Sequence, residues 1–266
     1  MNTRCRVPMV LMGVVCFGAP ATVGAQRGLA SRIDAVKTGR VRLTVAAREG
    51  VCGDGMSWFQ TRSGNYTGTF NGNWNSSRDV EATCARGPVR LVIVREGHET
   101  TELRTYVGGQ WKADTGTTDL GQVSAPEVGA WLLRLAEFGS AKPARAAITA
   151  ATLTDSIDAS ATLLRIVKDE RQPSDVRANA LTWLGDAVGE KVSQTLDSIA
   201  YQPGDREVRR QAIFAVSRRP VAEAVPALLK LAESLPDREL RKTAVFWLVQ
   251  SKDPRAVAWV EKRLRQ

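Results

Sequence analysis

The sequence predicts an α+β protein of two domains, a small antiparallel β domain with one disulfide followed by an α-solenoid of paired helices. Three observations support this prediction. Apolar residues alternate with polar ones between residues 29 and 111, a period that is typical of half-buried strands. From residue 124 onward the apolar residues follow the helical period, and the helical segments recur every 32 residues. We therefore expect three parts: an export signal at 1–25, a β-rich domain at 26–123 and the solenoid at 124–266.

The amino terminus has the pattern of an export signal. Arg4 and Arg6 give it a positive start, the apolar stretch that follows is too short to span a bilayer, and small residues at 23–25 precede the expected cleavage point. The mature chain is then expected to begin near Gln26. This pattern predicts export by a bacterium to the periplasm or the extracellular space.

Removal of the signal would leave one pair of cysteines. Cys5 and Cys16 depart with the signal, and Cys52 and Cys84 remain as a pair suited to one disulfide in an oxidising compartment. A lipoprotein signal at Cys16 is the alternative, but the residues on either side are bulkier than such a cleavage site requires. No zinc site is expected, because His98 is the single histidine that could join the pair.

The charge of the chain limits the classes of partner. The formal net charge of +9 becomes +7 once the two arginines of the signal are removed (9 − 2). Lysine and arginine are spread over both domains and do not form the dense patch that nucleic-acid binding requires, so no nucleic-acid partner is expected. The excess favours weak attraction to an anionic lipid surface, an envelope polymer or acidic proteins. The mature chain is not expected to be an integral membrane protein.

Two segments of the first half predict strands. In "RVRLTVAAR" the apolar Val41, Leu43 and Val45 alternate with polar neighbours, and "PVRLVIVREGHETTELRTYV" contains two β-rich runs separated by residues 96–99. We expect an antiparallel sheet that contains a hairpin. The Gly- and Asn-rich segment between Cys52 and Cys84 is predicted to be either a long ordered loop or a short hairpin.

Candidate ligand-binding residues of the first half are few. Trp58, Tyr66 and Trp74, between the two cysteines, are a candidate site for stacking on a sugar or a peptide, with a role in the core of the small sheet as the alternative. Asp54 lies between two glycines and has the character of a cation ligand or a base, but the segment reads equally as a tight turn beside the disulfide. His98 falls in the predicted hairpin turn, where a surface position is expected. No catalytic constellation accompanies either residue.

The helical half begins at "SAPEVGAWLLRLAEF" and then repeats. Ser124 and Glu127 have the spacing of a capping box, and Pro126 lies in the first turn, where its missing N–H costs nothing. Similar helices follow at a spacing of 32 residues: "DVRANALTWL" from Asp175, "EVRRQAIFAV" from Glu207, "ELRKTAVFWL" from Glu239 and a weaker copy, "PARAAITAAT", from Pro143. Each copy has a partner helix with an apolar residue at the same offset: Leu164, Leu196, Leu228 and Val260. One helix pair cannot bury its apolar side alone, so the pairs are expected to stack into one core.

These copies resemble the HEAT-repeat superfamily, in particular the bacterial HEAT-like repeats related to bilin lyase subunits. The resemblance covers residues from about 124 to the end. It implies a right-handed α-solenoid in which the second helix of each pair lines a concave surface, and a binding scaffold without a cofactor. An enzyme or a non-catalytic enzyme subunit related to bilin lyases is the alternative that the same resemblance suggests.

Arginines recur at one position of the repeat. On a helical wheel this position flanks the buried side, and the acidic residues two positions earlier in three of the copies favour a ladder of charge-assisted hydrogen bonds between neighbouring units. We expect a stacking role rather than ligand binding, because a ligand does not require several equivalent arginines. The predicted stacking residues are Arg145, Asp175, Arg177, Glu207, Arg209, Glu239 and Arg241.

The opposite side of the same helices predicts a partner-binding strip. Phe214 and Phe246 occupy equivalent positions that face away from the buried side, with Arg210, Lys242 and Arg218 beside them. Aromatic and arginine side chains are favoured at the centres of interfaces. The alternative is that both phenylalanines pack against a loop or the first domain. We therefore predict an exported, non-enzymatic scaffold that binds another protein, with binding of envelope polymer or anionic lipid as a rival function.

Overall fold

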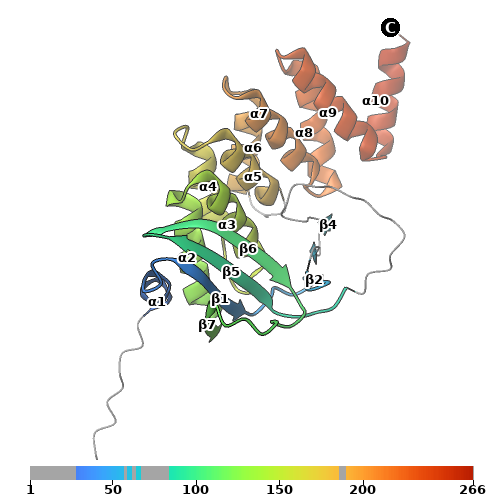
Figure 1. Ribbon diagram of the computed structural model, residues 1–266. Helices are drawn as coiled ribbons and strands as arrows, with labels where there is room; N and C mark the ends of the chain where they lie inside the picture. The colour runs from blue at the N-terminus through green and yellow to red at the C-terminus, as the bar shows by residue number, and fades with distance from the viewer. Residues whose placement is uncertain (1–27, 57–58, 62–63, 67–83, 186–189, 266) are drawn as a thin grey trace, which may run out of the picture.

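The computed structural model describes residues 28–56, 59–61, 64–66, 84–185 and 190–265, and it has the two expected parts. A four-stranded sheet is followed by a stack of helix pairs that rises away from it toward the carboxyl terminus (Figure 1). The α+β prediction is therefore confirmed. The predicted export signal at 1–25 and the candidate residues Trp58 and Trp74 lie outside the described residues.

The large sheet has the strand order β6-β5-β1-β7. Its strands are β1 (Gly39–Val45), β5 (Val89–Glu96), β6 (Glu99–Val107) and β7 (Thr117–Gln122). β5 and β6 form the predicted hairpin, and Gly97 has the positive φ of 63° that its turn requires. Buried residues alternate along β1, as the pattern of Val41, Leu43 and Val45 predicts.

The sheet is mixed, whereas an antiparallel one was predicted. β1 pairs antiparallel with β5 but parallel with β7. The sequence shows little sign of β7, because most of its residues are exposed and polar and no apolar alternation marks it as a strand. The short helix α1 (Leu29–Asp34) is the other element that periodicity did not predict; it buries Leu29 and Ile33 against the core.

A second, small sheet carries the disulfide. Its strands are β2 (Cys52–Gly53), β3 (Phe59–Thr61) and β4 (Gly64–Tyr66). The hairpin alternative is thus correct for residues 59–61 and 64–66, which pair antiparallel. Cys52 and Cys84 are bonded with their Cα atoms 5.2 Å apart, which confirms the predicted pair. The next residues, Gly53 and Ala85, exchange backbone hydrogen bonds, so the disulfide and a β-bridge join the same two segments.

Nine helices follow the large sheet in the described part of the chain. They are α2 (Ala125–Phe138), α3 (Ala141–Leu153), α4 (Ser160–Lys168), α5 (Ser174–Leu184), α6 (Glu190–Tyr201), α7 (Arg206–Ser217), α8 (Val221–Ser234), α9 (Arg238–Gln250) and α10 (Pro254–Leu264). Ser124 precedes α2 and Pro126 lies in its first turn, as predicted. The capping box is not formed, because the Ser124 hydroxyl donates to the Glu127 carboxylate and accepts no backbone N–H.

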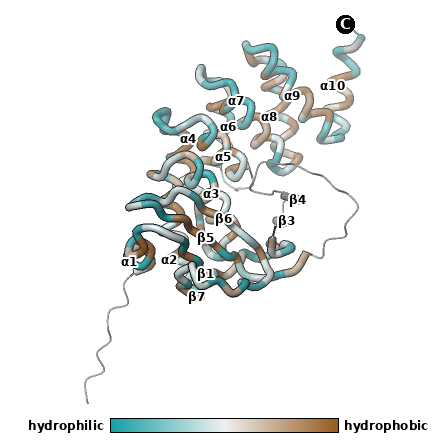
Figure 2. The backbone as a smooth tube through the Cα atoms, in the orientation of Figure 1, coloured by the Kyte–Doolittle hydropathy of each residue, from teal (hydrophilic) through white to brown (hydrophobic). Residues whose placement is uncertain are grey.

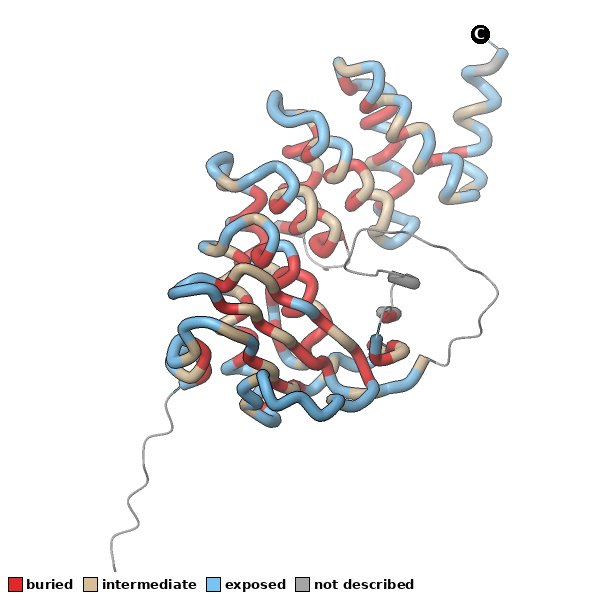
Figure 3. The backbone as a smooth tube through the Cα atoms, viewed as in Figure 1, coloured by how far each residue is buried: buried red, intermediate tan, exposed pale blue. Residues whose placement is uncertain are grey.

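The helices stack as pairs of consecutive helices. α3, α5, α7 and α9 are the second helices of their pairs, and each packs closely on the next; the first helices α2, α4, α6 and α8 touch one another sparsely. In a curved stack, neighbouring units pack most closely on the inner side. We therefore call the closely packed second helices the inner layer. The predicted apolar positions Leu164, Leu196 and Leu228 are buried between the layers, and Figure 3 shows buried residues concentrated there and on the strands. In Figure 2 the loops at the upper left edge of the stack are hydrophilic.

The large sheet covers the beginning of the inner layer. α3 contacts β5 and β6, and nine of its 13 residues are buried. Ala146 and Ala150 occupy the repeat positions of Arg210 and Phe214, yet they are only 6% and 0% exposed. Contact with the sheet distinguishes α3 from the later inner helices, so the sheet accounts for this burial. Small side chains at these positions let the sheet approach the helix.

Candidate functional site

The candidate residues near the disulfide have structural partners or lie at the surface. Asp54 Oδ1 accepts a hydrogen bond of 2.8 Å from the backbone N–H of Met56, which is the contact of a side-chain-stabilised turn. His98 is exposed in the β5–β6 turn, and its carbonyl accepts from Arg95. Tyr66 ends β4. Among the described residues, no group of three His, Cys, Asp or Glu side chains is placed to hold a metal ion.

The recurring arginines bind the ends of helices. The Nε of Arg177 donates to the carbonyl of Val167 at 2.9 Å, and the Nε of Arg209 donates to the carbonyl of Ala200 at 3.2 Å. Arg241 donates in the same way to the carbonyl of Leu235. These carbonyls lie at or just past the carboxyl ends of α4, α6 and α8, where backbone acceptors lack a helical partner and the helix dipole favours a cation. The three arginines therefore join the two helices of one unit.

The predicted ladder between units is present at one junction of the described chain. Arg145 of α3 pairs with Asp175 of α5 at 2.9 Å. At the later units Glu207 instead pairs with Arg210, and Glu239 pairs with Lys242, each one turn along its own helix. Because the arginines of these units are directed to helix carbonyls, their acidic neighbours pair locally. A different ion pair, Arg206 with Asp237 at 3.2 Å, joins α7 to α9.

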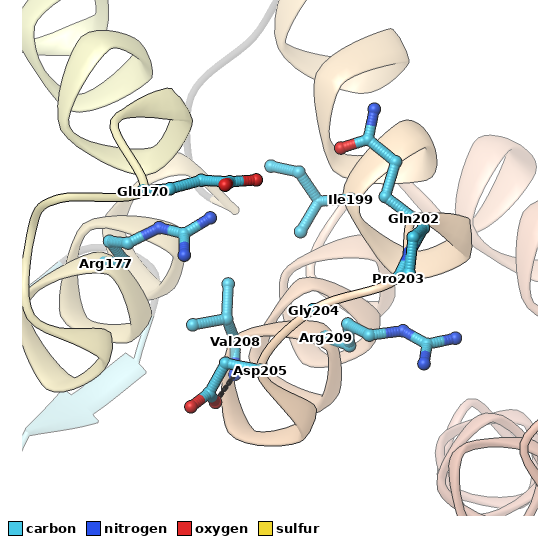
Figure 4. Close-up of a pocket in the computed structure, with 9 residues that line it drawn as sticks. All are labelled: Glu170, Arg177, Ile199, Gln202, Pro203, Gly204, Asp205, Val208 and Arg209. Atoms are coloured by element: carbon cyan, nitrogen blue, oxygen red, sulfur yellow. Dashed lines mark hydrogen bonds between the residues drawn. The ribbon is translucent and has the colours of Figure 1, made fainter.

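A charged groove lies at the junction of the second and third units. It has a volume of about 280 Å³ and is lined by residues of α5, α6 and α7 and of the loops before α5 and α7. Figure 4 shows Glu170 and Arg177 on one side and Gln202 on the other, with the Arg209 guanidinium directed away from Glu170. The dashed bond is that from Val208 N–H to Asp205, the cap of α7. Two cations and two carboxylates line this groove, so it has no preference for an ion of either sign.

A second groove lies among α7, α8 and α9 and contains the predicted Phe214. We call it the α7–α9 cleft; its volume is about 350 Å³, and its lining includes Phe214, Arg218, Val221, Leu228 and Trp247. The rings of Phe214 and Trp247 are 4.9 Å apart, and the Arg218 guanidinium lies 5.8 Å from the Phe214 ring. Aromatic rings at this spacing attract each other, and the cation adds to the attraction.

An exposed apolar patch continues this cleft across α9. Phe246 is 52% exposed, and its ring lies 4.9 Å from Trp247. Val249, one turn later on the same helix, is 55% exposed. Phe214 and Phe246 are thus brought into one aromatic cluster through Trp247. The sequence contains a signal for Trp247, because its repeat position is apolar in the earlier units, as Ala215 and Trp183, but that signal indicates a core position.

Two of the three cations of the predicted strip are paired on their own helices. Arg210 and Lys242 are both exposed, and each lies beside the glutamate one turn earlier, as described above. Glutamates therefore balance two of the predicted cations, while the third, Arg218, lies against the Phe214 ring. Exposed pairs of this kind contribute little to stability and exchange partners readily, because water screens them.

The open face of the large sheet is a third feature, and sequence reasoning missed it. Arg40, Arg42, Arg90 and Arg104 point to this face, together with Tyr106, and Trp111 lies beside them in a cavity of about 470 Å³. α2 and α3 lie on the other side of the sheet (Figure 1). The arginines occupy the polar positions of strands in which apolar and polar residues alternate. Such positions are ordinarily expected to face water, so no sequence signal marks these arginines as a site.

No helix in the described part of the chain is long and apolar enough to cross a membrane. Comparisons with curated proteins and with solved structures find no match. Residues 194–266, which run from within α6 through α10, match the family model for HEAT repeats. This match covers two of the strong sequence copies and the α7–α9 cleft, and it confirms the predicted resemblance there. The carboxyl-terminal part of the chain, residues 194–266, therefore consists of HEAT repeats.

Proposed function

We propose that this protein is a binding scaffold whose α7–α9 cleft receives an apolar segment of a partner protein. HEAT repeats suggest a protein-binding role. The observation that carries the site is an aromatic cluster: Phe214 and Trp247 are half-buried and line a groove of about 350 Å³, and the exposed Phe246 packs on Trp247 beside it. Large aromatic side chains beside a pocket are typical of the residues that contribute most to binding energy.

The surroundings of the cleft indicate how the partner is recognised. Its floor and walls are apolar at Val221, Leu228 and Trp247, so burial of a hydrophobic side chain supplies the affinity. The rim carries the Arg210–Glu207 and Lys242–Glu239 pairs. Charges at a rim influence orientation and the rate of association more than affinity. A partner segment with one or two large apolar residues flanked by charges of both signs fits this arrangement.

Paired surface substitutions test the site. Phe246→Ser with Val249→Ser removes the exposed part of the patch and leaves the core of α9 in place. Phe138→Ser with Val257→Ser is the matched control, because Phe138 is 75% exposed on α2 and Val257 is 50% exposed on α10. A partner is first identified by affinity capture with the native chain, and its dissociation constant is then measured for both variants. Loss of a central aromatic contact is expected to weaken binding about tenfold or more.

The expected result is weaker binding by the Phe246 and Val249 variant and unchanged binding by the control. Equal dissociation constants for the two variants would remove the exposed patch beside the cleft from the proposal. A salt titration separates the rival function, because binding to an envelope polymer or an anionic lipid surface weakens steeply with salt whereas apolar docking does not.

Export to the periplasm or the extracellular space is part of this proposed role. Arg4, Arg6 and the apolar stretch after them support it, and the Cys52–Cys84 disulfide hints at an oxidising compartment. The test is the amino-terminal sequence of the protein recovered from each cell fraction. Protein beginning near Gln26 in the periplasm is expected, and an intact Met1 end on protein confined to the cytoplasm would contradict export.

A binding role rather than a catalytic one completes the proposal. The candidate base Asp54 is engaged by the Met56 N–H in a turn, which supports a structural role for it. The rival is an enzyme subunit related to bilin lyases. Mixing the purified chain with a free bilin tests that rival: an unchanged visible absorption spectrum is expected, and a shifted spectrum with pigment bound to the chain would favour the rival.

A further inference from the structure

The open face of the large sheet presents a regular arrangement of side chains. In the register of β1, β5 and β6, Arg42 lies opposite Val92, which lies opposite Arg104. Neighbouring strands are about 4.8 Å apart, so the backbones at Arg42 and Arg104 lie roughly 10 Å apart, with the apolar Val92 between them. In the row toward the amino end of β5, Arg90 lies opposite Tyr106.

Cations outnumber carboxylates around this cavity. Five basic residues line it: Arg40, Arg42, Arg90, Arg104 and Lys112. Three carboxylates approach them, because Asp114 pairs with Arg40, Asp119 with Arg42 and Glu102 with Arg104. The difference is two positive charges (5 − 3). Glu102 also pairs with Lys142 of α3, so part of its charge is directed away from the cavity.

Arg90 is a buried cation held by neutral groups. It is 5% exposed, and its guanidinium donates to the carbonyls of Gly108, Gln110 and Gly55. No carboxylate pairs with it in the part of the chain that the structure describes. Burial lowers the pKa of Arg90 from its ordinary value, although nearby Tyr106 acts in the opposite direction. A buried charge without a counter-ion is costly, so an anion close to this side chain would be stabilised.

Aromatic side chains form one wall of the cavity. The Trp111 ring lies 4.7 Å from the Arg90 guanidinium and 5.3 Å from that of Arg42, and its Nε1 donates to the Thr44 hydroxyl at 3.0 Å. Tyr106 meets Trp111 edge to face, with ring centroids 6.5 Å apart. These contacts hold the wall in place and leave Val92 and the Tyr106 ring as apolar lining. The volume of about 470 Å³ lies in the range of pockets for small organic ligands.

We infer that this cavity binds a small organic anion, a molecule with a carboxylate or phosphate group attached to an apolar body. The acidic group lies between Arg42 and Arg104, on either side of Val92, with Lys112 at the rim, and the apolar body lies on Val92 and Tyr106. Two observations favour a free small molecule over a membrane surface: Arg90 is recessed to 5% exposure and the Arg42 side chain to 15%. A flat bilayer cannot reach cations at that depth. The site is independent of the α7–α9 cleft.

Calorimetric titration of the full chain with phenyl phosphate tests the site. Inorganic phosphate supplies the acidic group alone and benzyl alcohol supplies the ring alone. Phenyl phosphate is expected to bind at one site and more tightly than either. The variant Arg104→Gln with Lys112→Gln should weaken this binding about tenfold or more, because hydrogen bonds to charged groups contribute at that level. Arg238→Gln with Lys168→Gln is the control, since both residues are exposed on helices away from the sheet.

Unchanged thermal unfolding of both variants verifies that they fold. The inference is overturned if phenyl phosphate shows no saturable binding, if the cavity variant and the control bind it equally, or if inorganic phosphate binds as tightly. A final arm uses vesicles of phosphatidylcholine with phosphatidylglycerol. Binding to these vesicles without binding of phenyl phosphate would also overturn it, because the anionic lipid surface would then be the ligand.

Discussion

Exchanging Ala150 for the residue of a later repeat tests whether the sheet covers the inner layer. Ala150, Thr182, Phe214 and Phe246 share one position of the 32-residue repeat. The substitution Ala150→Phe places the side chain of the third and fourth units in the first unit, where the sheet packs. Thr182→Phe places the same side chain in the second unit, where that position is half-buried.

The structure predicts different costs for the two substitutions. Ala150 is 0% exposed, and inserting even small groups into a packed core costs about 1–3 kcal/mol, so a phenyl ring is expected to cost at least about 3 kcal/mol. Thr182→Phe loses the 2.8 Å hydrogen bond from Gln211 to the threonine hydroxyl, which costs about 1 kcal/mol of stability. Because this position is half-buried, the phenyl ring can extend to the surface. Thr182→Val loses the same bond without adding volume and is the matched control.

Chemical and thermal unfolding measure these differences. For a chain of this size about 1 kcal/mol corresponds to roughly 2–4 °C in Tm, so Ala150→Phe is expected to lower Tm by about 6–12 °C and both Thr182 variants by about 2–4 °C. Equal destabilisation by Ala150→Phe and Thr182→Phe would refute the reasoning, because it would mean that the sheet does not occupy this position of the first unit.

Three further predictions concern single interactions. Cys52→Ser with Cys84→Ser opens a closed loop of separation 32 and should lower the free energy of unfolding by about 3–4 kcal/mol; reduction of the native chain should have the same effect, and a loss below about 1 kcal/mol would contradict it. Arg177→Leu keeps the stem of the side chain but removes its hydrogen bond to the Val167 carbonyl, so the free energy of unfolding in urea should fall by about 1–2 kcal/mol. Arg171→Leu is the control, because the exposed ion pair of Arg171 with Asp169 joins no helices. It should change the free energy of unfolding by less than about 0.5 kcal/mol. The hydrogen bond from Arg104 lowers the pKa of Glu102, so the stability that this carboxylate contributes is complete above its unfolded pKa and is lost as the pH falls through its folded pKa. Glu102→Gln should therefore be less stable than the native chain at pH 7, and the difference should shrink as the carboxylate is protonated at acidic pH.

Much of the fold could be predicted from local patterns in the chain. The alternation in β1 and the two runs of the β5–β6 hairpin depend on neighbouring residues, and the structure has these strands where the pattern predicts them. The two cysteines outside the predicted export signal can form a single pair, and they do. β7 escaped prediction because an exposed polar strand at the edge of a sheet has no apolar face to reveal it.

The candidate sites were only partly predictable. Helical geometry indicated that Phe214 and Phe246 face away from the core, but it could not show that Trp247, at a repeat position that is buried in earlier units, lies between them. The pairing of Arg210 with Glu207 was equally hidden, because the wheel shows the direction of a side chain and not its partner. The basic cavity brings together residues from four strands and two loops, and only the register of the strands places them side by side.

Repetition along the chain was sufficient to establish that helix pairs stack, since a recurrence of 32 residues requires equivalent units that bury one another's apolar sides. It could not distinguish units that are identical in local pattern but differ in what lies next to them. Ala150 and Phe214 have the same place in the repeat, but the sheet covers Ala150 completely whereas Phe214 is half-buried and lines the cleft. The position of the sheet on the first unit, set by contacts between distant segments, decided which part of the inner layer is free to bind.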